Sequence, residues 1–289
     1  MIKEITILSG KGGTGKTSIS AALASISSDA VFCDSDVDAA DMHLLMHPEV
    51  QETHDFAGGR TAEINPQACS GCGICMDHCR FDAISANPEG TFTIDPFQCE
   101  GCRLCERVCP EEAITSQLEM NNHWFVSRTR FGPLLHATMA AGEENSGKLV
   151  TKVRKKARDI AREKGYGLII NDGPPGIGCP VIASITGTQG VLLVIEPTLS
   201  GYHDAGRVVD LVRSFEVPVW AVINKSDIND SLANKIRGFL KQESIPLLAT
   251  IPFDRRMVES MIRGKTIMEY APDSAPSQAI REIWDSLSG

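Results

Sequence analysis

The stretch ITILSGKGGTGKT (residues 5–17) decides the fold of this chain. Its leading apolar residues predict a short buried strand, and an apolar-periodic pattern near 16–27 predicts a helix. Between them, residues 10–17 satisfy G-x-x-x-x-G-K-[S/T] in the strand–loop–helix context that this pattern requires. Backbone N–H groups in such a loop turn inward on a phosphate, and the helix amino terminus adds partial positive charge. The alternative, a glycine-rich turn without a ligand, leaves the agreement of these elements unexplained.

The loop therefore predicts a site for Mg2+ and a nucleoside triphosphate. Lys16 is expected to reach the β- and γ-phosphates, and the Thr17 hydroxyl is expected to ligate Mg2+. The predicted phosphate cradle comprises Gly10, Gly12, Gly13, Thr14, Gly15, Lys16, Thr17 and Ser18.

Further apolar runs place the loop in a larger sheet. Strands are predicted at 30–34 (AVFCD), 167–172 (GLIIND), 190–196 (GVLLVIE), 217–224 (VPVWAVIN) and 245–251 (IPLLATI). Continuous apolar runs are typical of parallel strands that are buried on both faces. Helical patterns alternate with them at 148–164, 180–187, 203–214, 229–243 and 276–287. The predicted fold is α/β, a doubly wound and mostly parallel sheet with ligands at the carboxyl ends of its strands.

Two cysteine runs share one spacing, C-x2-C-x2-C-x3-C, and lie thirty residues apart. This is the double run of a bacterial-type ferredoxin, in which the fourth cysteine of each run ligates the other run's [4Fe-4S] cluster. The expected ligand sets are Cys69, Cys72, Cys75 and Cys109 for one cluster, and Cys99, Cys102, Cys105 and Cys79 for the other. Structural zinc and disulfides are the alternatives. Zinc prefers thiolate pairs separated by a longer loop, and disulfides need an oxidising compartment.

The cysteine runs interrupt the strand–helix alternation. They predict an inserted ferredoxin domain at 62–116, within a P-loop domain formed by 1–61 and 117–289. The formal net charge is −9, and residues 66–116 contain eight acidic residues against three arginines. An acidic chain without a basic stripe predicts no nucleic-acid partner. No apolar stretch is long enough to span a bilayer, and residues 1–10 lack the pattern of a signal peptide. A cytoplasmic protein without a stable membrane anchor is expected.

The loop sequence KGGTGKT (11–17) resembles the deviant Walker A motif of the MinD/ParA/Mrp/nitrogenase-iron-protein superfamily. The resemblance continues at Asp34-Ser35-Asp36 and at DGPPGIG (172–178), which looks like the Walker B and switch II segment. It implies an ATPase in which Lys11 crosses a dimer interface onto the partner's nucleotide. It also implies that Asp34 and Asp172 hold Mg2+ through water, and that Asp36 positions the attacking water. With its cysteine insert, the chain resembles MinD-superfamily ATPases that carry a ferredoxin domain.

Two short motifs bear on the nucleotide base. Residues 224–227 (NKSD) match N-K-x-D, with which many GTPases read guanine, although helix capping also explains Ser226 or Asp227. In the MinD/Mrp group an asparagine here contacts adenine, helped by a Pro-x-Asp loop that residues 252–254 resemble. ATP, giving ADP, is therefore the expected nucleotide, with Asn224, Pro252 and Asp254 near its base.

Several further residues are assigned from their patterns. Ile280, Ile283, Trp284 and Leu287 form a helical stripe that predicts core packing rather than membrane contact, because only Arg281 near it is basic. Cys33 is expected to be a small buried hydrophobe. Cys179 lies at an offset similar to that of a cluster-ligating cysteine in the nitrogenase iron protein. Within 121–148, the aromatic residues are either core or a partner-facing surface. Four histidines show no metal-like spacing: His43, His47, His54 and His203.

Three functions fit these parts. The first is ATP-gated electron transfer to a partner protein, driven by a nucleotide-dependent dimer. The second is an iron–sulfur or metal-cluster assembly or carrier ATPase of the Mrp kind, and the third is a MinD-like positioning ATPase with a redox-sensing ferredoxin. Complete ligand sets favour the first, because a carrier usually needs a labile site. The absence of a Cys-x-x-Cys after Cys109 and of a basic tail disfavours the other two. Expected partners are a second copy or a similar paralogous subunit, and a redox or metal-cluster client.

Overall fold

The computed structural model describes residues 2–139 and 146–288, which form two compact units. We call residues 2–54, 124–138 and 146–288 the sheet unit, and residues 55–123 the cysteine unit. Each unit has its own hydrophobic core. No helix within the described ranges is both long and apolar enough to cross a bilayer.

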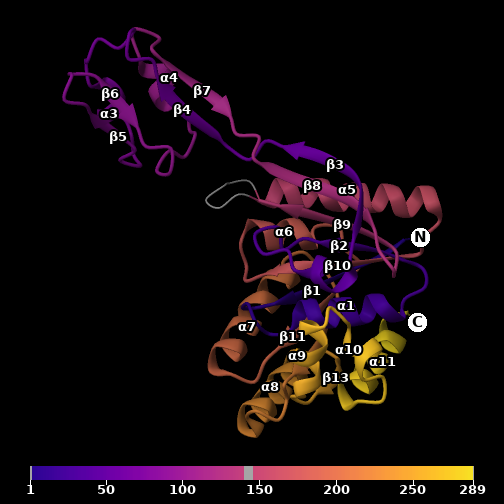
Figure 1. Cartoon of the computed structure of the whole chain (residues 1–289). Helices are drawn as coiled ribbons and strands as arrows, with labels where there is room; N and C mark the ends of the chain where they lie inside the picture. The colour runs from indigo at the N-terminus through magenta and orange to yellow at the C-terminus, as the bar shows by residue number, and fades with distance from the viewer. Residues whose placement is uncertain (1, 140–145, 289) are drawn as a thin grey trace. The chain divides into compact units, whose positions relative to one another are not determined.

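A nine-stranded sheet, ordered β13-β12-β11-β1-β10-β2-β9-β8-β3, forms the centre of the sheet unit (Figure 1). Strand β1 pairs in parallel with β10 and β11, and parallel pairing continues through β12 to β13 and through β2 to β9. The strands are β1 (Lys3–Ser9), β2 (Ala30–Asp34), β3 (Glu49–Phe56), β8 (Asn122–Arg128), β9 (Pro133–Thr138), β10 (Leu168–Pro175), β11 (Gly190–Ile195), β12 (Val219–Asn224) and β13 (Leu247–Ile251). The predicted mostly parallel α/β sheet is confirmed.

Helices cover both faces of this sheet. One core is shared with α1 (Lys16–Ile26), α2 (Met42–Met46), α10 (Ile267–Tyr270) and α11 (Ala275–Ser288). The other core is shared with α6 (Cys179–Ile185), α7 (Leu199–Arg213) and α8 (Asp230–Gln242). Helix α5 (Ser146–Lys164) packs against α6 and against β2, β9 and β10, and α9 (Arg255–Ile262) follows β13.

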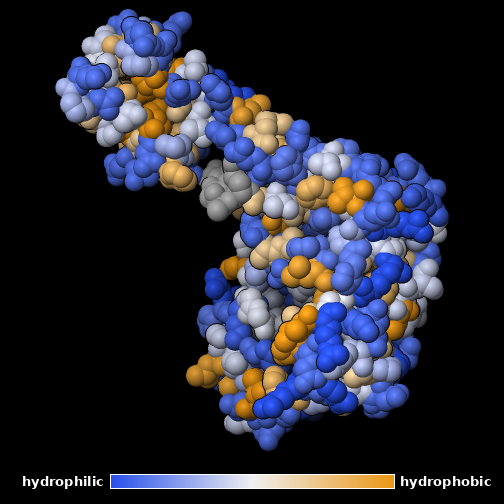
Figure 2. All heavy atoms as spheres, viewed as in Figure 1, coloured by the Kyte–Doolittle hydropathy of each residue, from blue (hydrophilic) through white to orange (hydrophobic). Residues whose placement is uncertain are grey.

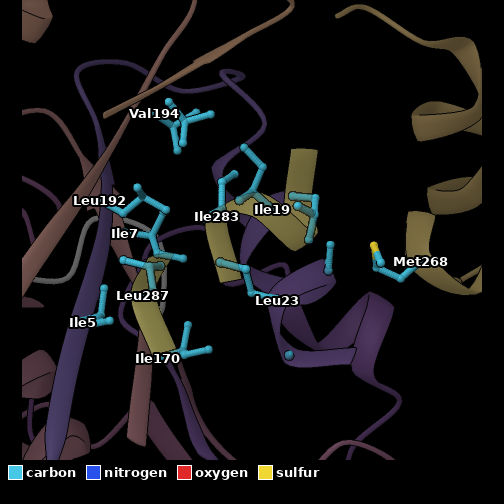
Figure 3. Close-up of a cluster of buried hydrophobic side chains, with 14 of the residues drawn as sticks. Ile5, Ile7, Ile19, Leu23, Ile170, Leu192, Val194, Met268, Ile283 and Leu287 are labelled. Atoms are coloured by element: carbon cyan, nitrogen blue, oxygen red, sulfur yellow. The ribbon is translucent and has the colours of Figure 1, made fainter. Parts of the chain in front are cut away.

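Strand side chains alternate between the two cores, because successive residues of a strand point to opposite faces. In β11, Leu192 and Val194 belong to the first core, whereas Val191, Leu193 and Ile195 belong to the second. Figure 3 shows part of the first core, where strand residues lie beside residues of α1 and α11. Burial on both faces explains the continuous apolar runs. The predicted core role of the α11 stripe is also confirmed, since Ile280, Ile283 and Leu287 are buried.

The sequence analysis missed the three strands at one edge of the sheet. Residues of β3 are almost all exposed, and β8 and β9 mix polar with apolar residues. None of these three strands therefore gives a continuous apolar run. Within β8 the Trp124 side chain is buried, and Phe131 packs against the first core. The core interpretation of these two aromatic residues is confirmed. Residues 140–145 of the same segment lie outside the described residues.

The cysteine unit contains two small antiparallel sheets and two short helices. β4 (Arg60–Ile64) pairs with β7 (Ile114–Leu118), and β5 (Ile84–Ala86) pairs with β6 (Phe92–Ile94). α3 (Ile74–Asp77) and α4 (Leu104–Val108) each lie within a cysteine run. The unit extends beyond the predicted 62–116 insert, because β4 and β7 pair from Arg60↔Leu118 inward.

Candidate nucleotide and iron–sulfur sites

A cavity of about 630 Å3 opens at the carboxyl ends of the sheet-unit strands. This volume falls in the range of roughly 300–1,000 Å3 that is usual for small-molecule sites. The P-loop forms one wall, and the segments that follow β2, β10, β12 and β13 form the others. Its lining includes the predicted residues Gly12, Gly13, Thr14, Gly15, Lys16, Thr17, Ser18, Asp36, Asn224, Pro252 and Asp254.

The P-loop packs closely against Asn224, and glycine at position 15 permits this contact. Gly15 has φ +91°, and a Cβ there would lie 2.4 Å from the Asn224 side-chain nitrogen. That nitrogen, Nδ2, donates a hydrogen bond to the Thr14 carbonyl at 2.7 Å. The structure thus gives Asn224 a second role, holding the loop to the end of β12. The Thr14 hydroxyl oxygen is buried and has no hydrogen-bond partner among the described residues, as suits a group that awaits a phosphate oxygen.

Lys16 lies among three acidic side chains, of which Asp34 and Asp36 come from the end of β2 and Asp172 comes from β10. Its Nζ is 3.2 Å from Asp172 Oδ1 and 3.5 Å from Asp36 Oδ2. Asp172 also accepts hydrogen bonds from Thr17 Oγ1 and from Ser20 Oγ, both at 2.7 Å. Asp34 is fully buried and accepts hydrogen bonds from the backbone N–H groups of Met42 and Asp36. The predicted Walker A lysine and Mg2+ aspartates therefore come together.

The electrostatics of this group fit a bound cation. Burial, with Asp172 nearby, raises the pKa of Asp34 well above its usual range. Burial and the same neighbour raise the pKa of Asp36 to about 6. Burial lowers the pKa of Lys16, but the surrounding carboxylates outweigh it and raise that pKa overall. Three carboxyl groups share one ammonium, so a divalent cation would relieve their repulsion.

Lys11 is held within its own chain by residues that the sequence analysis missed. Its Nζ lies 2.8 Å from Glu196 Oε2 and donates to Thr198 Oγ1 at 3.0 Å. Glu196 also binds Lys225 Nζ at 2.7 Å, and Lys225 donates to the Gly13 carbonyl at 3.0 Å. Burial opposes ionisation of Glu196, yet its hydrogen bonds to the two lysines lower its pKa. An acidic residue ending an apolar strand at the P-loop edge was the available signal.

At the expected base end of the cavity, the Asp254 side chain also stabilises the local backbone. The Asp254 side chain caps α9 by accepting from the Arg256 N–H, and it pairs with the Arg256 guanidinium at 2.6 Å. Asp227 accepts a hydrogen bond from the Phe253 N–H. Both carboxylates thus fix the 252–254 loop. The neighbouring wall of the cavity is apolar and consists of Phe253, Met257, Val258 and Met261.

The eight run cysteines surround two separate cavities in the cysteine unit. One cavity is lined by Cys69, Cys72, Cys75 and Cys109, together with Ile64, Phe92 and Ile114. The other is lined by Cys79, Cys99, Cys102 and Cys105, together with Phe81, Ile84 and Ile94. The structure therefore brings together the same two sets of four thiols that the sequence predicts. Four soft sulfur donors around an apolar space suit an iron–sulfur cluster.

The backbone of the two runs has the same special conformations thirty residues apart. Gly71 and Gly101 both have positive φ, and a Cβ on Gly101 would lie 2.2 Å from the Arg60 carbonyl oxygen. Gly73 and its counterpart Arg103 are also left-handed, as are Asp82 and Glu112. The chain accepts a left-handed arginine at this position, so the turn itself and not the residue type is the shared requirement.

Cys33 and Cys179 do not belong to the lining of these cavities. Cys33 is buried in β2, where burial raises its pKa to about 12. Cys179 is exposed at the start of α6. In the described part of the chain, His43, His47, His54 and His203 belong to no group of three or more His, Cys, Asp or Glu side chains arranged to hold a single metal ion.

Comparisons with known proteins find matches for both units of the chain. Residues 62–116 match the family described as a 4Fe-4S dicluster domain. The chain is 34% identical to the uncharacterized protein MJ0578 of Methanocaldococcus jannaschii, over 99% of this chain and 97% of that one. It is 28% identical to an iron–sulfur cluster carrier protein of Pyrococcus abyssi, over 49% of this chain and 52% of that one. The fold matches the septum site-determining protein MinD of Pyrococcus horikoshii, solved with Mg-ADP, at TM-score 0.60 and 19% identity, covering 99% and 96% of the chains.

The fold and the loop define a P-loop ATPase fold that carries an inserted 4Fe-4S dicluster domain. The chain belongs to the same family as MJ0578, which it matches along nearly its whole length. It is similar to the MinD/ParA/Mrp superfamily in fold and, over about half of its length, in sequence.

Proposed function

We propose that this chain binds and hydrolyses ATP in the sheet-unit cavity, and that the nucleotide state controls electron transfer through two [4Fe-4S] clusters to a partner protein. One observation carries the proposal. A P-loop cavity lined by acids and lysine occurs in the same chain as two cavities that each present four thiols.

In the nucleotide site, residues 10–18 would cradle the phosphates, with the buried Thr14 hydroxyl donating to a phosphate oxygen. Thr17, with Asp34 and Asp172 through water, would hold Mg2+, which when bound neutralises charge on the transferred phosphoryl group. Asp36 would orient the attacking water by accepting a hydrogen bond from it. Asn224 and Pro252 would lie at an adenine base, whereas Asp254 shapes the loop.

Lys11 would change its contacts when the monomer becomes a dimer. To reach a partner's nucleotide it must leave Glu196 and Thr198. Lys225 stays on Glu196 when Lys11 departs, so the carboxylate, only 11% exposed, keeps one positive partner. Leaving a buried charge uncompensated is costly, and this arrangement avoids that cost. Lys11 could therefore leave Glu196 on dimerisation without leaving a buried carboxylate unpaired.

Each cluster, when bound, supplies a one-electron carrier. The cysteine sets would be Cys69, Cys72, Cys75 and Cys109, and Cys79, Cys99, Cys102 and Cys105. A typical allosteric coupling of ~1–3 kcal/mol would shift a one-electron midpoint potential by roughly 40–130 mV, at ~59 mV per tenfold. Such a shift is large enough to bias electron flow toward a bound partner.

A second candidate function is cluster assembly or carriage for a client protein. It is favoured by the similarity of about half of this chain to a protein named as an iron–sulfur cluster carrier. The two functions differ in what leaves the chain, since one predicts that electrons leave and the other that iron leaves.

An anaerobic experiment separates them. The chain with reconstituted clusters is mixed with ATP and Mg2+, an iron chelator and an apo-ferredoxin as acceptor, and iron is measured in each species. Electron transfer predicts that iron stays bound and that the cluster midpoint potential moves when nucleotide binds. Iron that moves to the acceptor only during ATP hydrolysis would establish the carrier function instead. The Lys16→Ala variant, which should not bind the phosphates, is the control and should show neither effect.

A further inference from the structure

The cysteine unit repeats one turn ahead of each cysteine run. The Gln67 N–H donates to Asn65 Oδ1 at 3.0 Å, and thirty residues later the Phe97 N–H donates to Asp95 Oδ1 at 2.9 Å. Positions 67 and 97 are therefore structurally equivalent, and each lies two residues before the first cysteine of its run. Their side chains differ in kind, since one is a polar amide and the other is an aromatic ring.

The Phe97 ring is 97% exposed, so it adds nothing to the core of the cysteine unit. The equivalent turn forms with a glutamine, which means that the turn itself does not require an aromatic side chain. Single exposed apolar side chains are common on protein surfaces, so Phe97 alone carries no inference. A second aromatic residue, beside the same thiols, gives Phe97 its meaning.

This second residue is Phe81. The four thiols that line its cavity are called here the second thiol set: Cys79, Cys99, Cys102 and Cys105. The other four run cysteines line the other cavity and form the first thiol set. Phe81 lines the cavity of the second set and is 43% exposed, whereas its counterpart thirty residues later, Glu111, lines the cavity of the first set. Both equivalent positions are therefore aromatic beside the second set and polar beside the first.

Phe81 and Phe97 extend from the same end of the β5–β6 ladder. The Asp95 N–H donates to the Ala83 carbonyl at 2.8 Å, next to the last paired residues of the two strands. Because β5 and β6 are antiparallel, the segment before β5 and the segment after β6 begin at this one end. Each phenylalanine lies two residues beyond that hydrogen bond, and we call the two the aromatic pair. Figure 2 shows apolar residues among hydrophilic ones on the surface of this unit.

The surroundings of the aromatic pair are acidic. Residues 55–123 contain eleven acidic residues and four arginines, a formal net charge of −7. Within three residues of the pair in the sequence, three acidic residues and one arginine are exposed: Asp82, Asp95, Glu100 and Arg80. Thiolates that ligate a cluster add further negative charge. Charge complementarity therefore favours a basic partner face and disfavours a nucleic acid.

We propose that the aromatic pair is the docking surface at which a basic redox protein meets the second thiol set. This inference rests on the electron transfer proposed above, and it adds which thiol set faces the partner and what the partner's face contains. The partner would present an apolar patch to the two rings and a rim of lysine or arginine side chains to the surrounding acids. In each transfer one electron leaves the reduced chain and reduces the partner's oxidised centre, and no bond forms or breaks.

The test uses the full chain with reconstituted clusters, kept anaerobic and free of nucleotide. The probe is mitochondrial cytochrome c, a small basic haem protein. Its binding to the oxidised chain is measured by titration calorimetry, and its reduction by the reduced chain is followed by haem absorbance in a stopped-flow instrument. For wild type, binding and reduction should both weaken steeply as ionic strength rises.

Phe97→Ser should weaken binding and slow the second-order reduction about fivefold or more at low salt, because an aromatic anchor is lost. The variant should keep the iron content and the midpoint potential of wild type, since the ring is almost fully exposed. The matched control is Gln67→Ser, which places the same residue in the equivalent turn beside the first set. It should bind and reduce cytochrome c as wild type does. Dichlorophenolindophenol, a small dye that needs no protein docking, should be reduced equally fast by all three chains.

The outcomes separate the docking surface from the proposed function. Equal binding by wild type and Phe97→Ser, or equal losses in both serine variants, would overturn the docking surface and leave electron transfer standing. So would a wild-type chain that reduces the dye but not cytochrome c. An equal loss in Phe97→Ser when flavodoxin, an acidic carrier, replaces cytochrome c would overturn the basic partner. A wild-type chain that reduces neither the dye nor cytochrome c would overturn the proposed electron transfer itself, and this inference with it.

Discussion

The sheet unit assembles its cavity from residues that lie far apart in the sequence, whereas the cysteine unit draws all eight thiols from residues 69–109. In the sheet unit, Asp34, Asp172 and Glu196 meet the P-loop because parallel strands end at one edge of the sheet. In the cysteine unit, the ligands are near one another mainly because the chain turns tightly around them. One site depends on a fold, and the other depends on a local spacing.

The same contrast appears in the cores. Two large clusters of buried side chains stabilise the sheet unit on either side of its sheet. The core of the cysteine unit contains six buried residues, Ala62, Ile64, Cys75, Ile84, Phe92 and Ile114, and one of them is a proposed ligand. Small domains with so little apolar burial usually need a metal or disulfides for stability. The cysteine unit should therefore depend on its clusters for folding, while the sheet unit should not.

Removing the iron should have the largest effect, and this effect should be confined to the cysteine unit. Anaerobic chelation should raise amide hydrogen exchange in β4 and β7 by at least an order of magnitude, because metal-binding free energy acts as folding free energy in small domains. Exchange in β1, β10 and β11 should change little. All three tryptophans lie in the sheet unit, so tryptophan emission gives a second readout that should also stay constant. Unchanged exchange in β4 and β7 after complete loss of iron would contradict this dependence.

Substituting Lys11 should affect only the sheet unit. Lys11→Ala should abolish ATP-dependent dimers, because no other side chain at that position could reach a partner's nucleotide. Both clusters should still assemble with unchanged visible absorption and iron content. Dimerisation is measured by sedimentation with ATP and Mg2+, using Lys241→Ala on the exposed face of α8 as the control. Loss of iron from the Lys11 variant would show that the two units are not independent.

Pairs of cysteine variants sharpen the assignment of ligands within the cysteine unit. Cys69 and Cys109 line one cavity, and Cys79 lines the other. Cys69→Ser combined with Cys109→Ser should therefore lose about half of the bound iron, no more than either single change. Cys69→Ser combined with Cys79→Ser should lose nearly all of it, although both cysteines belong to one run. Iron analysis and absorption after reconstitution decide this, and the opposite pattern would place each cluster within its own run.

The two regions also differ in how much of them could be predicted. The spacing of the eight cysteines predicts a ligand role for each of them, and the predicted sets line the two cavities. The P-loop could be predicted equally well, because its glycines and its lysine lie close together in the sequence. The contacts of Lys11 with Glu196 and Thr198, and of Lys225 with Glu196, could not be predicted, because they form only when β11 and β12 align. Asp254 was assigned to the base from a three-residue motif that cannot show its pairing with Arg256.

The edge strands show a similar limit. A central strand that is buried on both faces gives a continuous apolar run, whereas β3 gives no periodic signal because it is exposed on nearly every residue. The pairing of the basic side chains of α5 was also hidden, although every residue of the helix is visible in the sequence. Packing against neighbouring elements decides that Arg154 and Arg158 pair with Glu4 and that Lys156 pairs with Glu52.

Acid should destabilise the sheet unit through one buried histidine. Burial, with a contribution from His43, lowers the pKa of His136 to about 4, and Ser127 lies 3.0 Å from its Nε2. The unfolded state binds the proton more tightly, with a pKa near ~6.5, so this stability is complete above that pH and is lost as pH falls toward 4. Between pH 7 and pH 5, His136 alone should lower the free energy of unfolding by about 2 kcal/mol, whereas Asp34 and Asp36, whose pKa values are raised by burial, bind protons in the folded state and oppose this loss. Urea unfolding followed by tryptophan emission measures it. His136→Gln should reduce that loss, whereas His203→Gln, at a side chain that is 73% exposed, should not.

The smallest expected effect concerns the ion pair between Glu196 and Lys11. Glu196→Gln removes the charge that keeps Lys11 in its own chain but leaves Lys225 bound to the Gly13 carbonyl. A partly exposed ion pair contributes about 1 kcal/mol or less, so the ATP concentration for half-maximal dimerisation should fall by up to about fivefold. Glu243→Gln, which removes a comparable pair with Arg213 on the surface, should leave it unchanged. A higher ATP requirement in the Glu196 variant would mean that this carboxylate stabilises the closed dimer and does not restrain the monomer. Sedimentation across an ATP titration distinguishes the two, because the direction of the shift and not its size carries the answer.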